Sequence, residues 1–276
     1  MQQHKSATEF TKDTEFWGNV AKKYNSMGNL GTLLAVEALR LLNLTDQDRF
    51  VLDVAAGTGN FALQAARELK RLHPQGGAQV LATDFAEAML GACKFEVDQQ
   101  GLGDIIQCKL MDAQDLGEIK DGSVDAVGCV LGAMEMRRVL REGGRAAIVV
   151  LHKVATVSLM TELCARLDAS DQRPPLDLAQ AAYKLADADF FRAQLNQAGF
   201  AGDHVVSITK FEGDWTGLEV DNVVGWVLDN PVVSQRYSER RDEVEATLRQ
   251  LLTDPGSPFY IHAKWQNQTL IALVQK

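Results

Sequence analysis

An acidic residue stands near the end of a short apolar run at about residue 50, and two glycines follow it closely. Within the segment Val51–Ala62, Gly57 and Gly59 let the backbone approach a ligand closely, and the helix expected next offers free N–H groups. Asp53 adds a carboxylate at the start of the same turn. These residue types suit the binding of a nucleoside-containing ligand, and a tight turn without a ligand is the alternative.

Two further carboxylates follow the next two strand-like runs along the chain. Asp84 can accept hydrogen bonds from ribose hydroxyls, although aspartate is also a common residue at the start of a helix. Asp112 can accept one from the exocyclic amine of adenine while the N–H of Ala113 donates to a ring nitrogen, unless Asp112 is a solvated loop residue. Because ligands bind at the carboxyl ends of strands in open α/β sheets, we expect these residues to border one site.

Two kinds of adenosine-containing ligand fit this site. The spacing Gly57-x-Gly59-x-x-Ala62 matches the loose fingerprint of dinucleotide-binding loops, which favours a nucleotide-dependent oxidoreductase. A carboxylate at Asp53 would repel a pyrophosphate, however, and it suits S-adenosylmethionine, whose ammonium and sulfonium are cationic. S-adenosylmethionine is therefore the favoured cofactor, with the oxidoreductase and a non-catalytic adenosine-ligand-binding protein as alternatives.

The elements that must position these residues alternate between strands and helices. Short continuous apolar runs predict buried strands at Phe50–Val54, Val80–Ala82, Ile105–Leu110, Val124–Leu131 and Ala146–Leu151. Helices are predicted at Phe61–Leu72, Ala86–Gln99, Met134–Arg141, Thr156–Leu167 and Asp187–Ala198. This alternation is typical of an α/β fold in which a parallel sheet carries helices on both faces.

Both ends of the chain depart from the alternation. We expect residues 1–45 to form a helical cover, and residues 46–276 to form one α/β domain with a helical insertion at about 214–255. The last two strands are predicted at Val205–Phe211 and Thr269–Val274, with helices at Trp215–Leu228 and Ser234–Leu252 between them. Both the cover and the insertion are rich in apolar residues, so we expect them to enclose a small, mostly apolar acceptor.

Several segments, in this order, resemble the successive motifs of class I S-adenosylmethionine-dependent methyltransferases. They are Val51–Gly59, Thr83-Asp84, Asp112-Ala113, Val124–Cys129 and Arg138–Gly144. The chain is most similar to the ubiquinone/menaquinone biosynthesis-like, or type 11, small-molecule enzymes. The resemblance implies a Rossmann-like, seven-stranded, mostly parallel sheet with helices on both faces and an antiparallel last strand.

The resemblance also implies which residues bind S-adenosylmethionine. Asp53 would lie near the methionine ammonium, Asp84 would hold the ribose, and Phe85 would pack on the adenine. Asp112 and Ala113 would contact the adenine edge, and Cys129 would lie beside the methionine part. The full set is Tyr24, Asp53, Ala55, Gly57, Gly59, Asp84, Phe85, Asp112, Ala113 and Cys129.

The sequence departs from the family pattern at four places, of which the turn Arg141-Glu142-Gly143-Gly144, in place of Lys-Pro-Gly-Gly, is a mild change. Ala55 stands where relatives usually have glycine, and Asn25 replaces the acid of a Tyr-Asp pair that closes the N-terminal segment over the cofactor. The segment from Cys129 to Met134 lacks a loop that borders the substrate in relatives. The largest of these departures, between Cys129 and Met134, concerns the acceptor side of the site.

Methyl transfer from a sulfonium is an in-line displacement, so the protein mainly supplies proximity and orientation. The acceptor is expected to be a small organic molecule with an oxygen, nitrogen, sulfur or carbon nucleophile. A base is needed when that nucleophile must lose a proton. His152, expected just after the fifth strand, is the candidate base, and a structural histidine is the alternative.

Composition narrows the possible partners. The chain has 28 Lys and Arg residues against 37 Asp and Glu, a net charge of −9, and no basic cluster for a nucleic-acid backbone. Its four cysteines are scattered without metal-ligand spacing, so we expect no metal and reduced thiols. Without a signal-like or membrane-spanning apolar segment, the sequence predicts a cytoplasmic protein that does not insert into membranes.

Overall fold

The computed structural model describes residues 14, 17–18, 21, 28–130, 135–169 and 187–276. These residues form two compact units. The first, here called the sheet unit, comprises the described residues within 31–150, 185–211 and 269–276. The second, the helical unit, comprises those within 1–30, 151–184 and 212–268.

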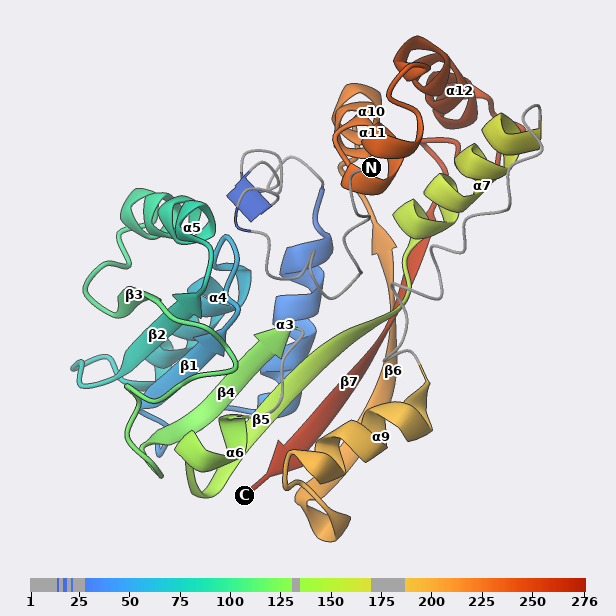
Figure 1. Cartoon of the computed structure of the whole chain (residues 1–276). Coiled ribbons are helices and arrows are strands. Elements are labelled where there is room, and N and C mark those ends of the chain that lie inside the picture. Colours follow the sequence, from blue (N-terminus) through green and yellow to red (C-terminus); the bar gives the residue numbers. More distant parts are fainter. Residues whose placement is uncertain (1–13, 15–16, 19–20, 22–27, 131–134, 170–186) are drawn as a thin grey trace. The chain divides into compact units, whose positions relative to one another are not determined.

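Seven strands form one sheet in the order β3-β2-β1-β4-β5-β7-β6 (Figure 1). The first five strands pair in parallel, and β7 runs antiparallel to both its neighbours. This topology confirms the predicted Rossmann-like fold class. The strands are β1 (Phe50–Val54), β2 (Gln79–Asp84), β3 (Ile106–Leu110), β4 (Val124–Val130), β5 (Leu140–Lys153), β6 (Val205–Trp215) and β7 (Trp265–Gln275).

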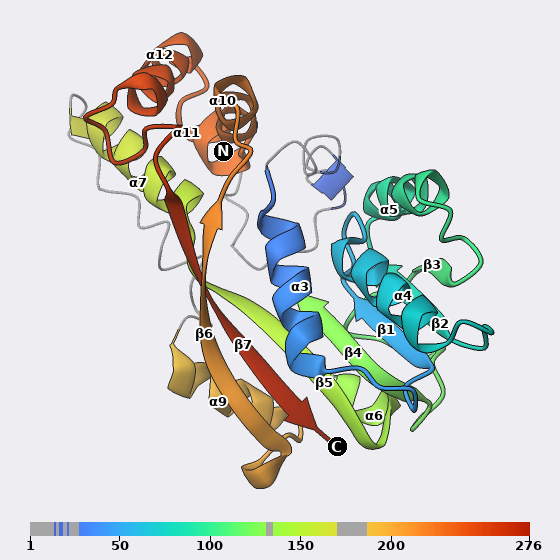
Figure 2. The same cartoon turned by 180° about the vertical axis from the view of Figure 1, so that it is seen from behind.

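Helices cover both faces of this sheet. Helices α3 and α4 lie over the face seen in Figure 2, and α6 and α9 lie over the opposite face, seen in Figure 1. A buried apolar cluster joins the sheet to α6 and α9, and its largest members include Leu52, Ile148, Phe191 and Phe200. The helices of this unit are α3 (Leu30–Leu42), α4 (Asn60–Leu72), α5 (Glu87–Gln99), α6 (Met136–Val139), α9 (Ala188–Gln197) and the short η1 (Gly202–His204).

The helical unit is built around a second apolar cluster, which includes Leu163, Val227, Leu248 and Trp265. Its helices are α7 (Ala155–Ala169), α10 (Val220–Leu228), α11 (Pro231–Arg236) and α12 (Arg241–Thr253). Asp168 of α7 is buried there and accepts hydrogen bonds from the Tyr237 hydroxyl at 2.8 Å and from Arg236 at 2.6 Å. Tyr237 therefore serves the packing of this unit.

The prediction of a helix over Met134–Arg141 was wrong in extent. Helix α6 has one turn, and β5 begins at Leu140 and continues through Gly143 and Gly144, well before the predicted start of the fifth strand. Pairing with β4 explains the difference, because Leu140 lies opposite Val124 and a register shift absorbs the extra residues. Leu140 is also fully buried, so packing overrides the local signal.

Two predicted helices after β6 also have different bounds. Trp215 ends β6 and packs edge-to-face on Trp265 at 6.2 Å between ring centroids, so the first helix begins only at Val220. The predicted helix Ser234–Leu252 is two helices, α11 and α12. Asn230 starts α11 by accepting a hydrogen bond from the N–H of Val232, with a proline in the first turn.

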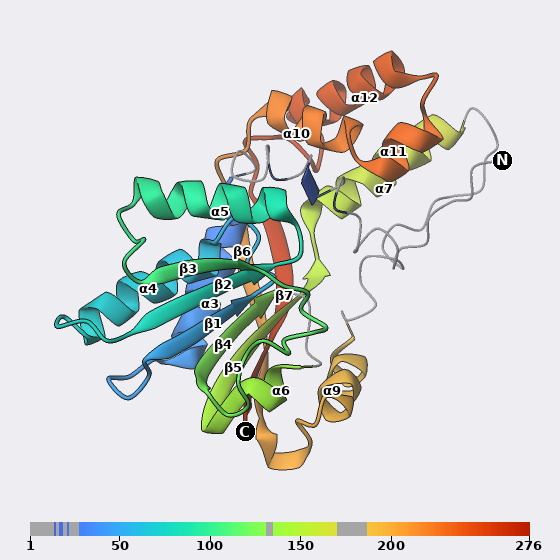
Figure 3. The same ribbon diagram turned by 60° about the vertical axis from the view of Figure 1, so that its left-hand side comes forward.

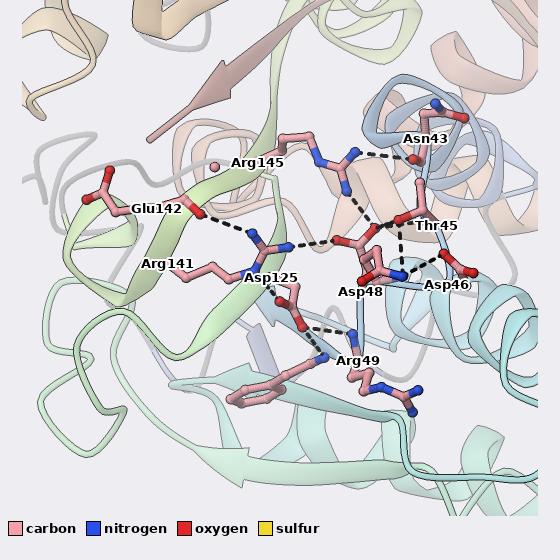
Figure 4. A network of polar contacts seen from close by, with 12 residues as sticks. Asn43, Thr45, Asp46, Asp48, Arg49, Asp125, Arg141, Glu142 and Arg145 are labelled. Atoms are coloured by element: carbon pink, nitrogen blue, oxygen red, sulfur yellow. Dashed lines mark hydrogen bonds and ion pairs between the residues drawn. The ribbon is translucent and has the colours of Figure 1, made fainter.

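A network of arginines and aspartates ties the amino ends of β1, β4 and β5 together (Figure 4). Asp48 is 1% exposed and lies 2.6 Å from the Arg145 guanidinium. Asp125 accepts hydrogen bonds from the N–H groups that open β1, both at 2.8 Å, and also from Arg141. This network fixes the amino edge of the sheet, and the candidate ligand residues lie at the opposite edge.

Candidate functional site

The chain leaves β1 at Val54 and turns sharply into α4. Ala55, Gly57 and Gly59 all adopt positive φ angles, of 56°, 56° and 87°. Gly59 immediately precedes α4 and donates its N–H to the carbonyl of Ala56 at 2.9 Å. Positive φ is costly for residues with a β-carbon, so two glycines here reduce the strain of the turn, whereas Ala55 carries it.

Gly57 and Gly59 face different surroundings. A β-carbon placed on Gly57 would meet nothing within 4 Å, so this part of the backbone borders open space. A β-carbon on Gly59 would lie 2.6 Å from Sγ of Cys93, so the helix α5 packs directly on that glycine. The loop thus offers a ligand an open approach at Gly57 and a rigid support at Gly59, which fits the predicted cofactor site.

Asp84 holds the loop against the end of β2. One carboxylate oxygen accepts the N–H of Gly57 and the other accepts the N–H of Ala86, both at 2.9 Å. Burial raises the pKa of Asp84, and these backbone N–H groups partly oppose that effect. Its carbonyl also accepts the N–H of Met111 at 2.9 Å, which brings the end of β3 to the same place.

Asp53 lies beneath the loop, within β1. Its carboxylate is 2% exposed and accepts the N–H of Ala62, in the first turn of α4, at 2.9 Å. Burial raises the pKa of Asp53 to about 8; the Ala62 N–H lowers it, and the nearby charges of Asp84 and Cys108 raise it further. Because those neighbours are acidic, a cationic ligand group would stabilise the Asp53 carboxylate.

The predicted adenine-contacting residues lie along the same edge. Phe85 is half-buried between β2 and α5, and Ala113 is half-buried against the core of the sheet unit. Asp112 is exposed in the loop after β3, where its Oδ1 accepts the N–H of Gln114 at 2.9 Å. The structure therefore places these residues at the carboxyl ends of β2 and β3, as the sequence predicts.

The structure describes two of the remaining three predicted residues. Cys129 is buried in β4, paired in register with Val54 of β1. His152 is half-buried within β5, not after it, because that strand runs on to Lys153. Tyr24 lies outside the described residues.

Two contacts at the loop were not anticipated from the sequence. The side chain of Asn60, the first residue of α4, accepts a hydrogen bond from the Thr32 hydroxyl of α3 at 3.1 Å. The sulfur atoms of Cys93 and Cys108 lie 3.6 Å apart beside Gly59. Gly31 is a signal that could have indicated the first contact, because a β-carbon there would lie 2.7 Å from the Asn60 amide.

The part of the chain that the structure describes holds neither a metal-ligand cluster nor a membrane-spanning helix. Within those residues, no three His, Cys, Asp or Glu side chains gather closely enough to hold a metal ion. None of the helices described is both long and apolar enough to cross a bilayer.

Residues 51–146 match the family described as a methyltransferase domain. A demethylmenaquinone methyltransferase of Bacteroides fragilis is 32% identical over 111 residues, which are 37% of this chain and 42% of that protein. A ubiquinone/menaquinone biosynthesis C-methyltransferase of Acidiphilium cryptum is 28% identical over 214 residues, 68% of this chain and 82% of that one. The chain thus spans less than half the length of the Bacteroides fragilis relative.

The fold has counterparts among solved structures. The YcgJ protein of Bacillus subtilis superposes with a TM-score of 0.52 at 13% identity, covering 88% of this chain and 97% of that one. At this identity the likeness concerns the fold alone, and it agrees with the sheet order described above. Residues 51–146 are therefore similar to a methyltransferase domain, and the chain is similar to ubiquinone/menaquinone biosynthesis methyltransferases.

Proposed function

We propose that the protein transfers a methyl group from S-adenosylmethionine to a small organic molecule. The observation that carries the proposal is the open backbone at Gly57, held by the buried carboxylate of Asp84 at the carboxyl edge of the sheet. The relatives named above support a small acceptor, since one is a demethylmenaquinone methyltransferase. A quinone-like ring is an apolar acceptor of the kind that the sequence favours.

The residues at the loop fit this cofactor. Asp53 would face the methionine ammonium, Asp84 the ribose hydroxyls, and Phe85 the adenine ring. Asp112 and Ala113 would contact the adenine edge, while Ala55, Gly57 and Gly59 supply close backbone. When bound, the cofactor supplies a methyl group on a sulfonium, and these residues orient it for in-line displacement.

The acceptor side of the site is proposed from the sequence. His152 would accept a proton from a nucleophile that must lose one. Cys129 would lie beside the methionine part, Tyr24 would close the N-terminal segment over the cofactor, and the insertion at about 214–255 would help to enclose the acceptor. Excluding water in this way keeps the reactive methyl group from hydrolysis.

Charge and composition support two further proposals, one about partners and one about location. The net charge of −9 disfavours a nucleic-acid partner, because phosphate backbones are bound by clustered cations. The scattered cysteines suit a reducing compartment, so we propose that the enzyme acts in the cytoplasm.

A transfer assay tests the proposed function. The full chain is incubated with methyl-labelled S-adenosylmethionine and fractionated small-molecule extracts, including demethylated quinones, and label in the organic phase is counted. We expect label in at least one fraction with the wild-type protein and none with Gly57→Val. Label that stays on the cofactor with every fraction, although the cofactor binds, would favour a non-catalytic adenosine-ligand-binding protein.

A further inference from the structure

Two cysteines form a pair beside the cofactor loop. Cys93 is buried in α5, and Cys108 is half-buried in the edge strand β3, over which α5 lies (Figure 3). Their sulfur atoms share a hydrogen bond 3.6 Å long. A disulfide needs a sulfur separation of about 2.05 Å, so side-chain motion of about 1.5 Å would join them.

The pair has one reactive member. The pKa of Cys108 is lowered to about 7, first by the hydrogen bond to Cys93 and also by the nearby Lys94 ammonium, against the opposing effect of burial. The pKa of Cys93 is raised, first by the hydrogen bond with Cys108 and also by burial. Cys108 is thus the thiolate that attacks, and Cys93 is the thiol that resolves.

The pair is also coupled to the loop. Sγ of Cys93 lies 2.6 Å from the position of a β-carbon on Gly59, so this sulfur packs against the loop backbone. The charge of Cys108 acts on Asp53, and those of Asp53 and Asp84 act on Cys93. Drawing Cys93 toward β3 would remove the support beneath Gly59.

We propose that Cys93 and Cys108 form a reversible disulfide by exchange with a low-molecular-weight disulfide, and that this bond weakens cofactor binding at the Gly59 loop. The thiolate of Cys108 attacks one sulfur of the small disulfide, forms a mixed disulfide and releases one small thiolate. Cys93 then gives its proton to the released small thiolate and attacks the Cys108 sulfur, which releases the second small thiolate. Two protein thiols are oxidised to one disulfide, and one small disulfide is reduced to two thiols.

The effect on binding rests on the proposed function, whereas the formation of the bond does not. The reduced full-length protein is treated with oxidised glutathione and examined by intact mass and by non-reducing peptide mapping. We expect a loss of two hydrogens and a link between the peptides that contain Cys93 and Cys108. Hydrogen exchange of residues 55–63 should then become faster, which reports on the loop without any ligand.

Calorimetry with S-adenosylhomocysteine measures the coupling. We expect affinity to fall at least about fivefold on oxidation, the lower end of typical coupling between sites, and to return with dithiothreitol. Cys108→Ser should abolish the loss of two hydrogens, the faster loop exchange and the loss of affinity. Cys164→Ala, which changes a buried cysteine of the helical unit, should keep all three responses.

Three outcomes would overturn the proposal: a link that involves another cysteine, a stable glutathione adduct without a link, or an unchanged loop after the link has formed. If the reduced protein fails to bind S-adenosylhomocysteine, the proposed function fails. Mass and hydrogen exchange still decide the cysteine pair in that case.

Discussion

The carboxylate of Asp84 has one structural role and one proposed ligand-binding role. It holds the N–H groups of Gly57 and Ala86, and it is proposed to accept hydrogen bonds from the ribose. Asp84→Ala should weaken S-adenosylhomocysteine binding by about 1.5–3 kcal/mol, the range for hydrogen bonds to a charged partner. Calorimetry measures the loss, and Asp104→Ala, at an exposed ion pair with Lys70, should leave affinity unchanged. Unchanged affinity in Asp84→Ala would remove this residue from the site.

Asp53 makes stability depend on pH. In the folded protein its carboxyl holds a proton up to a pKa of about 8, whereas in the unfolded chain it ionises near the ordinary value of 3.8. Between these values the folded state binds more protons, so the free energy of unfolding falls as pH rises. Below about pH 4 both states are protonated at this residue, and the contribution is fully present.

The variant Asp53→Asn should remove this part of the pH dependence. Urea unfolding at pH 5, 6, 7 and 8 should show a shallower decline than in the wild type, by up to about 1.4 kcal/mol per pH unit. The raised pKa of Asp84 acts in the same direction and should leave a residual slope in the variant. Parallel curves for the two proteins would show that Asp53 ionises normally in the folded state.

A substitution in the β1–α4 loop should abolish ligand binding while the protein still folds. Gly57→Val should abolish S-adenosylhomocysteine binding, because its side chain would fill the open space at the loop. The positive φ should cost about 1–2 kcal/mol of stability while the fold remains. Gly76→Val is the matched control, since Gly76 also has a positive φ and open space but lies between α4 and β2.

Calorimetry measures the affinity of both glycine variants for S-adenosylhomocysteine, and thermal unfolding measures their stability. Gly76→Val should lose similar stability and keep normal affinity. If Gly57→Val binds S-adenosylhomocysteine as well as Gly76→Val does, the ligand lies elsewhere.

Local patterns predicted the elements that carry the cofactor residues. The apolar run at Phe50–Val54 matches β1, and those of β2 to β4 lie within one or two residues of their predicted bounds. Strands buried on both faces are continuous apolar runs, and turn residues delimit them, so their positions follow from local sequence. The carboxylates at the ends of β1 and β2 follow from the same information.

Long-range contacts explain what the sequence did not show. The start of β5 at Leu140 depends on pairing with β4, and the contact of Asn60 with Thr32 joins residues 28 positions apart. The Cys93–Cys108 pair likewise needs α5 to lie over β3. Such contacts depend on tertiary packing, which spacing along the chain does not encode.

The helical cover proposed for residues 1–45 can be tested by truncating the chain. Asn29 exchanges two hydrogen bonds with Thr216, at 3.2 and 2.9 Å, so the end of the N-terminal segment is attached to the chain that follows β6. Deleting residues 1–28 should leave S-adenosylhomocysteine binding largely in place and abolish acceptor methylation. A truncated protein that stays folded and keeps its turnover and acceptor affinity would show that the segment does not cover the acceptor.

Calorimetric titration of the reduced full chain with S-adenosylhomocysteine and, separately, with NADH measures directly which ligand the β1–α4 loop binds. We expect saturable, one-to-one binding of S-adenosylhomocysteine and no detectable heat with NADH. The ammonium of the first ligand would stabilise the ionised Asp53 carboxylate, whereas a pyrophosphate would oppose its ionisation. Tight binding of NADH without binding of S-adenosylhomocysteine would rule out the proposed methyltransferase and make the oxidoreductase the better interpretation.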